Sequence, residues 1–130
     1  MTKRKEPRWL LAEVVLAIHK MLIAEHGGTG EVRDRGLLES ALARAKNLHS
    51  YEKPSLARLA ATYAFGIAKN HPFVDGNKRV ALTAAAVFME INGLTFDAAE
   101  AEVVAVFRDL AAGKITEDEL TVWLEKNSHK

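Results

Sequence analysis

Apolar residues recur every three or four positions along most of the chain, the spacing that places side chains on one face of an α-helix. Six segments show this pattern, and none shows the strict alternation of a half-buried strand. We therefore predict an all-α, single-domain bundle of about six helices. The helical segments run approximately over residues 9–26, 34–48, 55–70, 77–92, 97–112 and 116–127, with residues 94–96 as a short extended link.

Residues that favour helix ends bound most of these segments. Asp34, Ser55, Asp97 and Thr116 stand where each could accept a hydrogen bond from the first helical turn. Thr116 with Glu119 has the spacing of a capping box. Glycines follow the first, fourth and fifth segments, as is common after a helix C-terminus.

The periodicity also predicts which side chains face inward. In the first segment the predicted stripe is Leu11, Val14, Val15, Ile18 and Leu22. Residues 49–54 are expected to form a connecting loop, with Tyr51 packed against the body of the protein. Arg33 and Arg35 flank the Asp34 cap, and we expect them to form ion pairs at the surface or to face solvent.

Composition narrows the class of protein. The chain has 130 residues, 48% of them hydrophobic and 27% charged, which suits one soluble globular domain. We assign residues 1–8 to a flexible tail and 9–127 to the domain. The net charge of +1 gives no reason to expect a nucleic acid or an anionic membrane as partner. Cysteine is absent, and no uncharged run could span a bilayer, so we expect a cytoplasmic protein.

His19 and His26 lie within the first predicted helix. No second metal ligand stands at a suitable spacing from either of them. We therefore expect both to be packing or surface residues.

The run His71-Pro72-Phe73-Val74-Asp75-Gly76-Asn77-Lys78-Arg79 joins the third and fourth segments. Pro72 disfavours helical geometry at the residue before it, so the incoming helix should end there. Asp75-Gly76 is a turn or helix-start signal. The run therefore predicts a helix, a tight loop and a helix, with Phe73 anchoring the loop in the core.

Lys78 and Arg79 then fall in the first turn of the outgoing helix. Cations are unfavourable there by roughly 0.3–1 kcal/mol each, because the N-terminal end of the helix dipole is positive. A phosphate bound to the free N–H groups and both side chains would compensate, and Gly76 would let the backbone approach it closely. The alternative is a solvated helix start, with Asp75 as its N-cap and His71 ending the preceding helix.

This central run resembles the signature of the Fic/Doc superfamily, His-x-Phe-x-Asp/Glu-Gly-Asn-(Gly or Lys)-Arg. The similarity is closest to the Doc (death-on-curing) branch, the toxin half of toxin–antitoxin pairs. Further similar stretches lie at residues 27–34, 36–41, 68–70 and 92–94, so the resemblance extends over about residues 10–124. It implies a helical bundle whose active-site loop lies between two central helices.

The resemblance also implies roles for the residues of the loop. His71 is similar to the general base, and Asp75 to the residue that orients Mg²⁺. Gly76, Asn77, Lys78 and Arg79 are similar to the cradle for the phosphates of ATP. Arg79 would in addition stabilise transition-state charge, as a catalytic residue.

Two positions depart from the adenylyl-transferring Fic proteins. Lys78 stands where those proteins have glycine, and Leu82 where they have a second arginine. In the Doc branch this pattern implies that the γ-phosphate of ATP, rather than AMP, is transferred to a hydroxyl of the translation factor EF-Tu. It also implies a Phd-like antitoxin, a segment of which folds as a helix in a groove of the toxin.

Two alternatives remain open. The first is transfer of AMP to a protein hydroxyl by the same fold. The second is a catalytically silent module that only binds its antitoxin, against which the intact set of loop residues argues. Direct binding of nucleic acid is the least favoured function because no basic stripe is present. The sequence does not indicate an oligomeric state.

Overall fold

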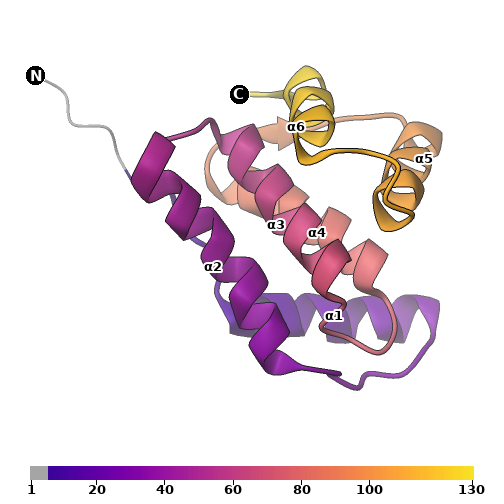
Figure 1. Cartoon of the computed structure of the whole chain (residues 1–130). Helices are drawn as coiled ribbons and strands as arrows, with labels where there is room; N and C mark the ends of the chain where they lie inside the picture. The colour runs from indigo at the N-terminus through magenta and orange to yellow at the C-terminus, as the bar shows by residue number, and fades with distance from the viewer. Residues whose placement is uncertain (1–5) are drawn as a thin grey trace, which may run out of the picture.

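The computed structural model describes residues 6–130 and confirms the helical fold, with six α-helices in that range (Figure 1). The helices are α1 (Ala12–His26), α2 (Arg35–Glu52), α3 (Leu56–Asn70), α4 (Asn77–Ile91), α5 (Glu100–Ala111) and α6 (Glu117–Lys126). Two strands of two residues each, β1 (Thr95–Phe96) and β2 (Ser128–His129), pair antiparallel. The expectation of no strand is therefore wrong at one point, because the extended link, as β1, pairs with β2 near the C-terminus.

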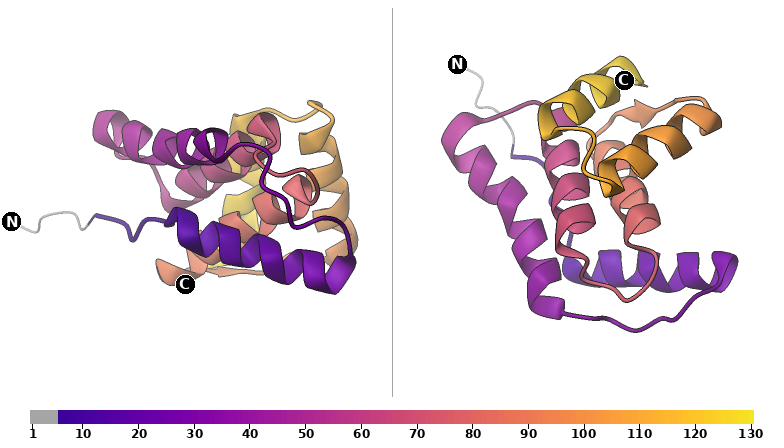
Figure 2. Two further views of the ribbon diagram at one scale, coloured as in Figure 1. Left: turned by 90° about the horizontal axis from the view of Figure 1, so that it is seen from below. Right: turned by 45° about the vertical axis from the view of Figure 1, so that its right-hand side comes forward.

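Helices α3 and α4 form the centre of the bundle. Figures 1 and 2 show α2 alongside α3, α5 and α6 at one end of the central pair, and α1 crossing its other end. Small residues dominate the contact between α3 and α4, where Ala60, Ala64, Ala81 and Ala84 are fully buried. Such small side chains let the two helix axes approach closely, as a buried central pair requires. The loop between α3 and α4 therefore emerges beside α1.

The ends of two helices differ from the prediction. Helix α2 continues to Glu52, and Tyr51 is 85% exposed rather than packed. No glycine or proline interrupts residues 49–52, so the helix ends only at Lys53, which adopts left-handed backbone geometry before Pro54. Asp97 does not cap α5 either, because the helix begins at Glu100 and its N-cap is Ala99. Asp97 N instead donates to Asn127 O at 2.7 Å beside the β1–β2 pair.

The inward face of α1 also differs from the predicted stripe. Leu11 and Val14 are 62% and 39% exposed, whereas Leu10 and His19 are buried. Leu11 is the N-cap and has extended backbone geometry, so it does not follow the helical period. Val15 and Ile18 are buried as predicted.

The N-terminal tail predicted for residues 1–8 lies mostly outside the described residues. Of that segment, Arg8 is held by Asn92, whose side chain accepts from Arg8 N at 2.8 Å and donates to Arg8 O at 3.0 Å. Among the described residues, no helix has both the length and the apolar character needed to cross a membrane.

Tyr63 supplies a prediction about pH. The phenol on α3 is almost completely buried and accepts a hydrogen bond from Leu10 N at 3.2 Å. Burial raises the pKa of Tyr63 to about 12, because the charged phenolate would lose its hydration. The folded state therefore binds the phenol proton more tightly than the unfolded state. The free energy of unfolding should fall as pH rises from 10 to 12, by roughly 2–3 kcal/mol from this group.

Urea unfolding at pH 8, 10 and 11.5 would measure this effect. Tyr63→Phe should unfold more easily at pH 8, because Leu10 N loses its acceptor, at a cost of roughly 1–3 kcal/mol. It should also lose much of the decrease at high pH. Tyr51→Phe, at an exposed position, is the matched control and should behave as the wild type. An undiminished decrease in Tyr63→Phe would assign the alkaline instability to other groups.

Candidate active site

The candidate site begins where α3 ends at His71. His71 has left-handed geometry, with φ 50° and ψ 58°, and its N–H donates to Ile67 O at 3.1 Å. A non-glycine residue in this region stores backbone strain and needs support from its surroundings. His71 therefore ends the helix, as one of the two interpretations of the sequence predicted. Its side chain is exposed and lines the cavity described below.

Arg33 supplies that support. Its guanidinium donates from Nε to His71 O and from Nη2 to Asn70 O, both at 2.7 Å. Its backbone N–H donates to Pro72 O at 2.8 Å. A cation bound to the last carbonyl groups of a helix is favourable both as a hydrogen-bond donor and for the helix dipole. Arg33 and Arg35 were expected to face solvent or to form surface ion pairs. Arg35 pairs with Glu13 at 3.0 Å, whereas Arg33, although exposed, donates to backbone carbonyl groups instead.

The segment before Arg33 lines up along the active-site loop. Val32 and Phe73 form an isolated antiparallel bridge, and Val74 N donates to Glu31 O at 3.2 Å. Thr29 N donates to Asp75 Oδ2 at 2.9 Å. Asp75 therefore does not cap α4. The N-cap is Gly76, whose φ of 85° is the left-handed geometry that glycine adopts without strain.

Phe73 anchors the loop in the core as predicted, with 1% of its surface exposed. It stacks on His19 of α1 with ring centroids 3.9 Å apart. The His19 ring also lies in hydrogen-bond contact with the backbone of the loop, with Nε2 2.9 Å from Asp75 O. The predicted packing role of His19 is confirmed, and the residue holds the loop against α1.

Asn77 holds the loop from within. Its side-chain amide donates to Phe73 O at 2.8 Å, and its carbonyl accepts from Phe73 N at 3.0 Å. The same amide nitrogen lies 3.4 Å from His71 Nδ1. Both polar atoms of this buried side chain are thus used inside the loop. What Asn77 can offer to a bound anion is its backbone N–H.

These contacts surround an open cavity of about 410 Å³. It is lined by His71, Val74, Asp75, Gly76, Asn77, Lys78, Arg79 and Ala111. No described side chain caps α4, and the first hydrogen bond of the helix runs from Val80 N to Gly76 O at 2.9 Å. The N–H groups of Asn77, Lys78 and Arg79 therefore precede the internal hydrogen bonds of the helix. The structure brings all the predicted site residues together around the N-terminus of α4, where free N–H groups could bind an anion.

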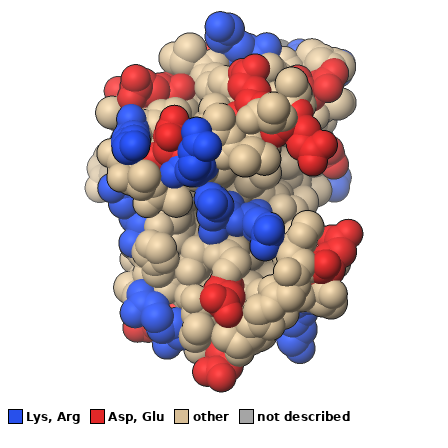
Figure 3. All heavy atoms as spheres, turned by 90° about the vertical axis from the view of Figure 1, so that its right-hand side faces the viewer, with Lys and Arg blue, Asp and Glu red and all other residues tan. Residues whose placement is uncertain are grey.

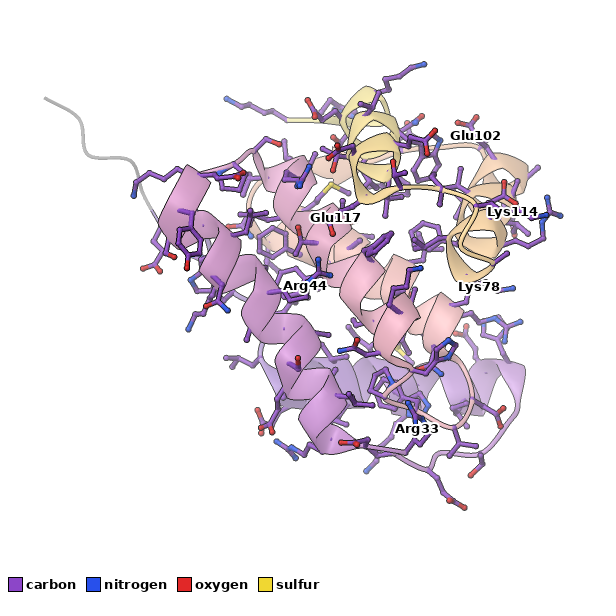
Figure 4. The ribbon with its side chains drawn as sticks, viewed as in Figure 1. Arg33, Arg44, Lys78, Glu102, Lys114 and Glu117 are labelled. Carbon is purple, nitrogen blue, oxygen red and sulfur yellow. The ribbon has the colours of Figure 1, made fainter. Side chains whose placement is uncertain are left out.

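The charged side chains are distributed to suit an anion. Figure 4 shows Lys78 between the start of α4 and α5, on the opposite side of the loop from Arg33. In the space-filling view that faces this side of the protein, lysine and arginine side chains gather across the middle of the surface (Figure 3). Lys78 and Arg79 are both exposed. In the described range no carboxylate lies within ion-pair distance of either of them.

The Arg33→Gln variant tests whether Arg33 matters because it holds the loop or only because it carries a charge at the surface. Loss of the two hydrogen bonds to the end of α3 should lower the free energy of unfolding by roughly 1–2 kcal/mol. It should also lower the rate of the reaction proposed below by about tenfold, because a small misplacement of a reacting group is costly. Arg35→Gln is the matched control, since Arg35 forms only exposed ion pairs, and it should change neither quantity measurably. Equal effects in the two variants would contradict the supporting role of Arg33.

Comparison with known proteins agrees with this geometry. A family model described as Fic/DOC family matches residues 9–89, which include the whole loop. "Protein kinase doc" of Escherichia phage P1 is 33% identical over 111 residues, which cover 84% of this chain and 83% of the relative. "Toxin Doc" of Mycolicibacterium smegmatis is 44% identical over 72 residues, which cover 52% of this chain and 54% of the relative. The family resemblance inferred from the central run is thus confirmed, and the chain belongs to the Fic/DOC family.

Proposed function

We propose that this protein is a Doc-like toxin that transfers the γ-phosphate of ATP to a hydroxyl side chain of an EF-Tu-like translation factor. The observation that carries the proposal is the N-terminus of α4, which has no side-chain cap. Its first turn bears Lys78 and Arg79 and opens into the same cavity as His71 and Asp75. The relatives named as a protein kinase and as a toxin support this function over others open to the fold.

The residues of the cavity fit a nucleotide phosphate. The free N–H groups of the first turn can each donate to a phosphate oxygen, and Arg79 can bind two oxygens at once. Lys78 adds a point charge suited to a terminal phosphate. The two cations, which weaken an empty helix N-terminus, become favourable once an anion is present. A bound phosphate thus explains the presence of both Lys78 and Arg79 in the first turn of α4.

Asp75 fits the metal that accompanies such a nucleotide. One of its oxygens accepts from Thr29 N, which orients the carboxylate, and no described residue donates to the other. Magnesium is commonly held by one or two carboxylates together with phosphate oxygens and water. Among the described residues no group of three or more potential metal ligands occurs. We therefore propose that Asp75 is the one described residue that coordinates the Mg²⁺ ion bound with the nucleotide.

His71 completes the proposed chemistry. When bound, ATP supplies the phosphoryl group, and Mg²⁺ neutralises charge on its phosphates. The hydroxyl oxygen of the acceptor forms the new bond to phosphorus as the bond to the β-phosphate oxygen breaks and ADP leaves. The His71 ring takes the hydroxyl proton. Arg33, Asn77 and the α3 terminus hold the ring in place for this step.

Intact-mass measurement tests the proposal directly. Purified EF-Tu would be incubated with the protein, ATP and Mg²⁺, beside a reaction that contains the His71→Ala variant. A mass gain of one phosphate, absent with the variant, is the expected result. A gain of AMP would show that the protein transfers a nucleotidyl group rather than a phosphate.

No mass gain on EF-Tu would lead to the same measurement on a whole-cell lysate. If a different protein gains phosphate, the reaction class stands and the translation-factor assignment is wrong. If no protein gains mass, the protein acts as a binding module without catalysis.

We further propose that a Phd-like antitoxin restrains the toxin by placing a helical segment in a groove on its surface. The relative named as a toxin supports a partner of this class. Expression of the chain alone should arrest growth, and expression together with a neighbouring antitoxin gene should relieve the arrest. Relief without formation of a complex between the two proteins would contradict direct restraint.

A further inference from the structure

His19 is a buried histidine of α1 that the proposed chemistry does not use. It is 1% exposed, and its ring contacts the active-site loop, which runs beside α1 (Figures 1 and 2). We propose that His19 is a positioning residue that orients the peptide bond between Asp75 and Gly76, so that the Gly76 N–H faces the cavity and donates to a bound phosphate. This inference rests on the phosphate-donor role proposed above.

The orientation of this peptide follows from its carbonyl group. His19 Nε2 lies 2.9 Å from Asp75 O. A carbonyl oxygen can only accept a hydrogen bond, so Nε2 carries the hydrogen in this contact. The peptide is trans, and in a planar trans peptide the C=O of one residue and the N–H of the next point in opposite directions. Because the Asp75 carbonyl group points toward α1, the Gly76 N–H points away from α1.

Backbone sterics alone do not fix this orientation. Gly76 has φ 85° and ψ 10°, which is the geometry of the third residue of a type II turn. Type I geometry differs in the orientation of the peptide that precedes this residue, and glycine can adopt both. In the type I orientation the Asp75 carbonyl oxygen would face the bound anion and repel it. A contact from outside the loop must therefore select the orientation, and His19 provides that contact.

The His19 ring is itself held in place. It stacks on Phe73, with ring centroids 3.9 Å apart and an interplanar angle of 12°. A Cβ atom at Gly76 would lie 3.7 Å from His19 Cδ2, so the ring packs directly against the peptide that it orients. Thr29 N donates to the Asp75 carboxylate at 2.9 Å. Asp75 is thus held at both polar groups, the carbonyl by α1 and the carboxylate by the segment before α2.

The Gly76 N–H is available to a ligand. Within the described residues no group accepts a hydrogen bond from it, whereas the Gly76 carbonyl accepts from Val80 N at 2.9 Å. Gly76 lines the same cavity as His71 and Asp75, and it directly precedes the free N–H groups of the first turn of α4. A hydrogen bond from an N–H group to a charged oxygen is strong, and a donor that is already oriented needs no reorganisation when the anion binds.

Calorimetric titration with inorganic tripolyphosphate in Mg²⁺ buffer tests this inference without any transfer reaction. His19→Phe keeps a flat ring against Phe73 but has no donor, so it should bind tripolyphosphate roughly 10–100-fold more weakly than the wild type. His19→Gln keeps an N–H donor and should stay within about threefold of the wild type. His26→Phe is the matched control, because His26 is an exposed histidine of the same helix, and it should bind as the wild type does.

Urea unfolding of the same variants separates orientation of the peptide from packing. His19→Gln should be less stable than His19→Phe, because it leaves space beside the buried Phe73 ring. The proposal therefore expects the less stable variant to bind tripolyphosphate more tightly. If affinity instead follows stability in the two variants, His19 acts through packing alone and the proposal is wrong.

Amide NMR spectra of the wild type provide a test that needs no variant. The Gly76 amide signal should shift when tripolyphosphate is added, together with the signals of Asn77, Lys78 and Arg79. If those three signals shift and that of Gly76 does not, the Gly76 N–H does not face the anion. The proposal would then be wrong, while the phosphate cradle would stand. If neither tripolyphosphate nor ATP binds the wild type, the proposed function fails, and this inference fails with it.

Discussion

Replacement of Arg79 by glutamine should lower the rate of phosphoryl transfer by about 10³-fold or more while the protein becomes slightly more stable. Arg79 is exposed in the first turn of α4, where its charge opposes the positive end of the helix dipole. Removal of that charge should raise the free energy of unfolding by a few tenths of a kcal/mol up to about 1 kcal/mol. An arginine that stabilises transition-state charge in phosphoryl transfer is worth about 10³–10⁵ in rate. The two effects have opposite signs, which a purely structural role for Arg79 would not produce.

Single-turnover rates and urea unfolding would measure the two effects in parallel. Arg79→Lys should fall between the wild type and Arg79→Gln in rate, since lysine keeps the charge but not the planar pair of donors. Arg108→Gln removes an arginine of α5 that is 66% exposed and does not line the active-site cavity, and it should retain the wild-type rate. A rate for Arg79→Gln within tenfold of the wild type would contradict the proposal that Arg79 stabilises the transition state.

The sequence predicted the helical architecture because its signals are local. Periodic apolar residues, the Ser55 and Asp34 caps and the Thr116–Glu119 capping box all act within a few positions along the chain, and the structure contains each of them. The central run could be recognised for the same reason. Its helix–loop–helix geometry follows from Pro72 and Gly76, both of which constrain the backbone directly.

The supports of the loop could not be predicted because they come from distant segments. Arg33 reaches the carbonyl of His71 across 38 positions, and His19 reaches that of Asp75 across 56. Neither contact has a local signature, since an arginine after a glycine-rich loop and a histidine in an amphipathic helix have many possible partners. The antiparallel alignment of Val32 with Phe73 places Arg33 at the end of α3.

Asp75 and Asp97 illustrate the limit of local capping rules. Each stands shortly before a helix and would cap it in isolation. Asp75 instead accepts from Thr29 N, and Asp97 is drawn to Asn127 through its backbone. At Asp75 a tertiary contact of the carboxylate takes the place of the local one, whereas α5 begins too late for Asp97 to cap it, with Ala99 as its N-cap. At Asp75 this leaves the N-terminus of α4 without a side-chain cap, and the proposed phosphate requires such free N–H groups.

His71 combines strained backbone geometry with the proposed role of general base, and two variants can separate these properties. Alanine and asparagine both remove the imidazole, so each should lower the transfer rate by roughly 10²–10⁴-fold. Asparagine tolerates left-handed geometry better than most residues, so His71→Asn should preserve the loop more closely than His71→Ala. Both variants should bind ATP as the wild type does, because the ring does not belong to the phosphate cradle. Single-turnover rates and ATP affinities would be measured for the three proteins together. If His71→Asn retained a large part of the rate, the backbone geometry of this residue would matter more than its ring, and proton transfer would have to be assigned to another group.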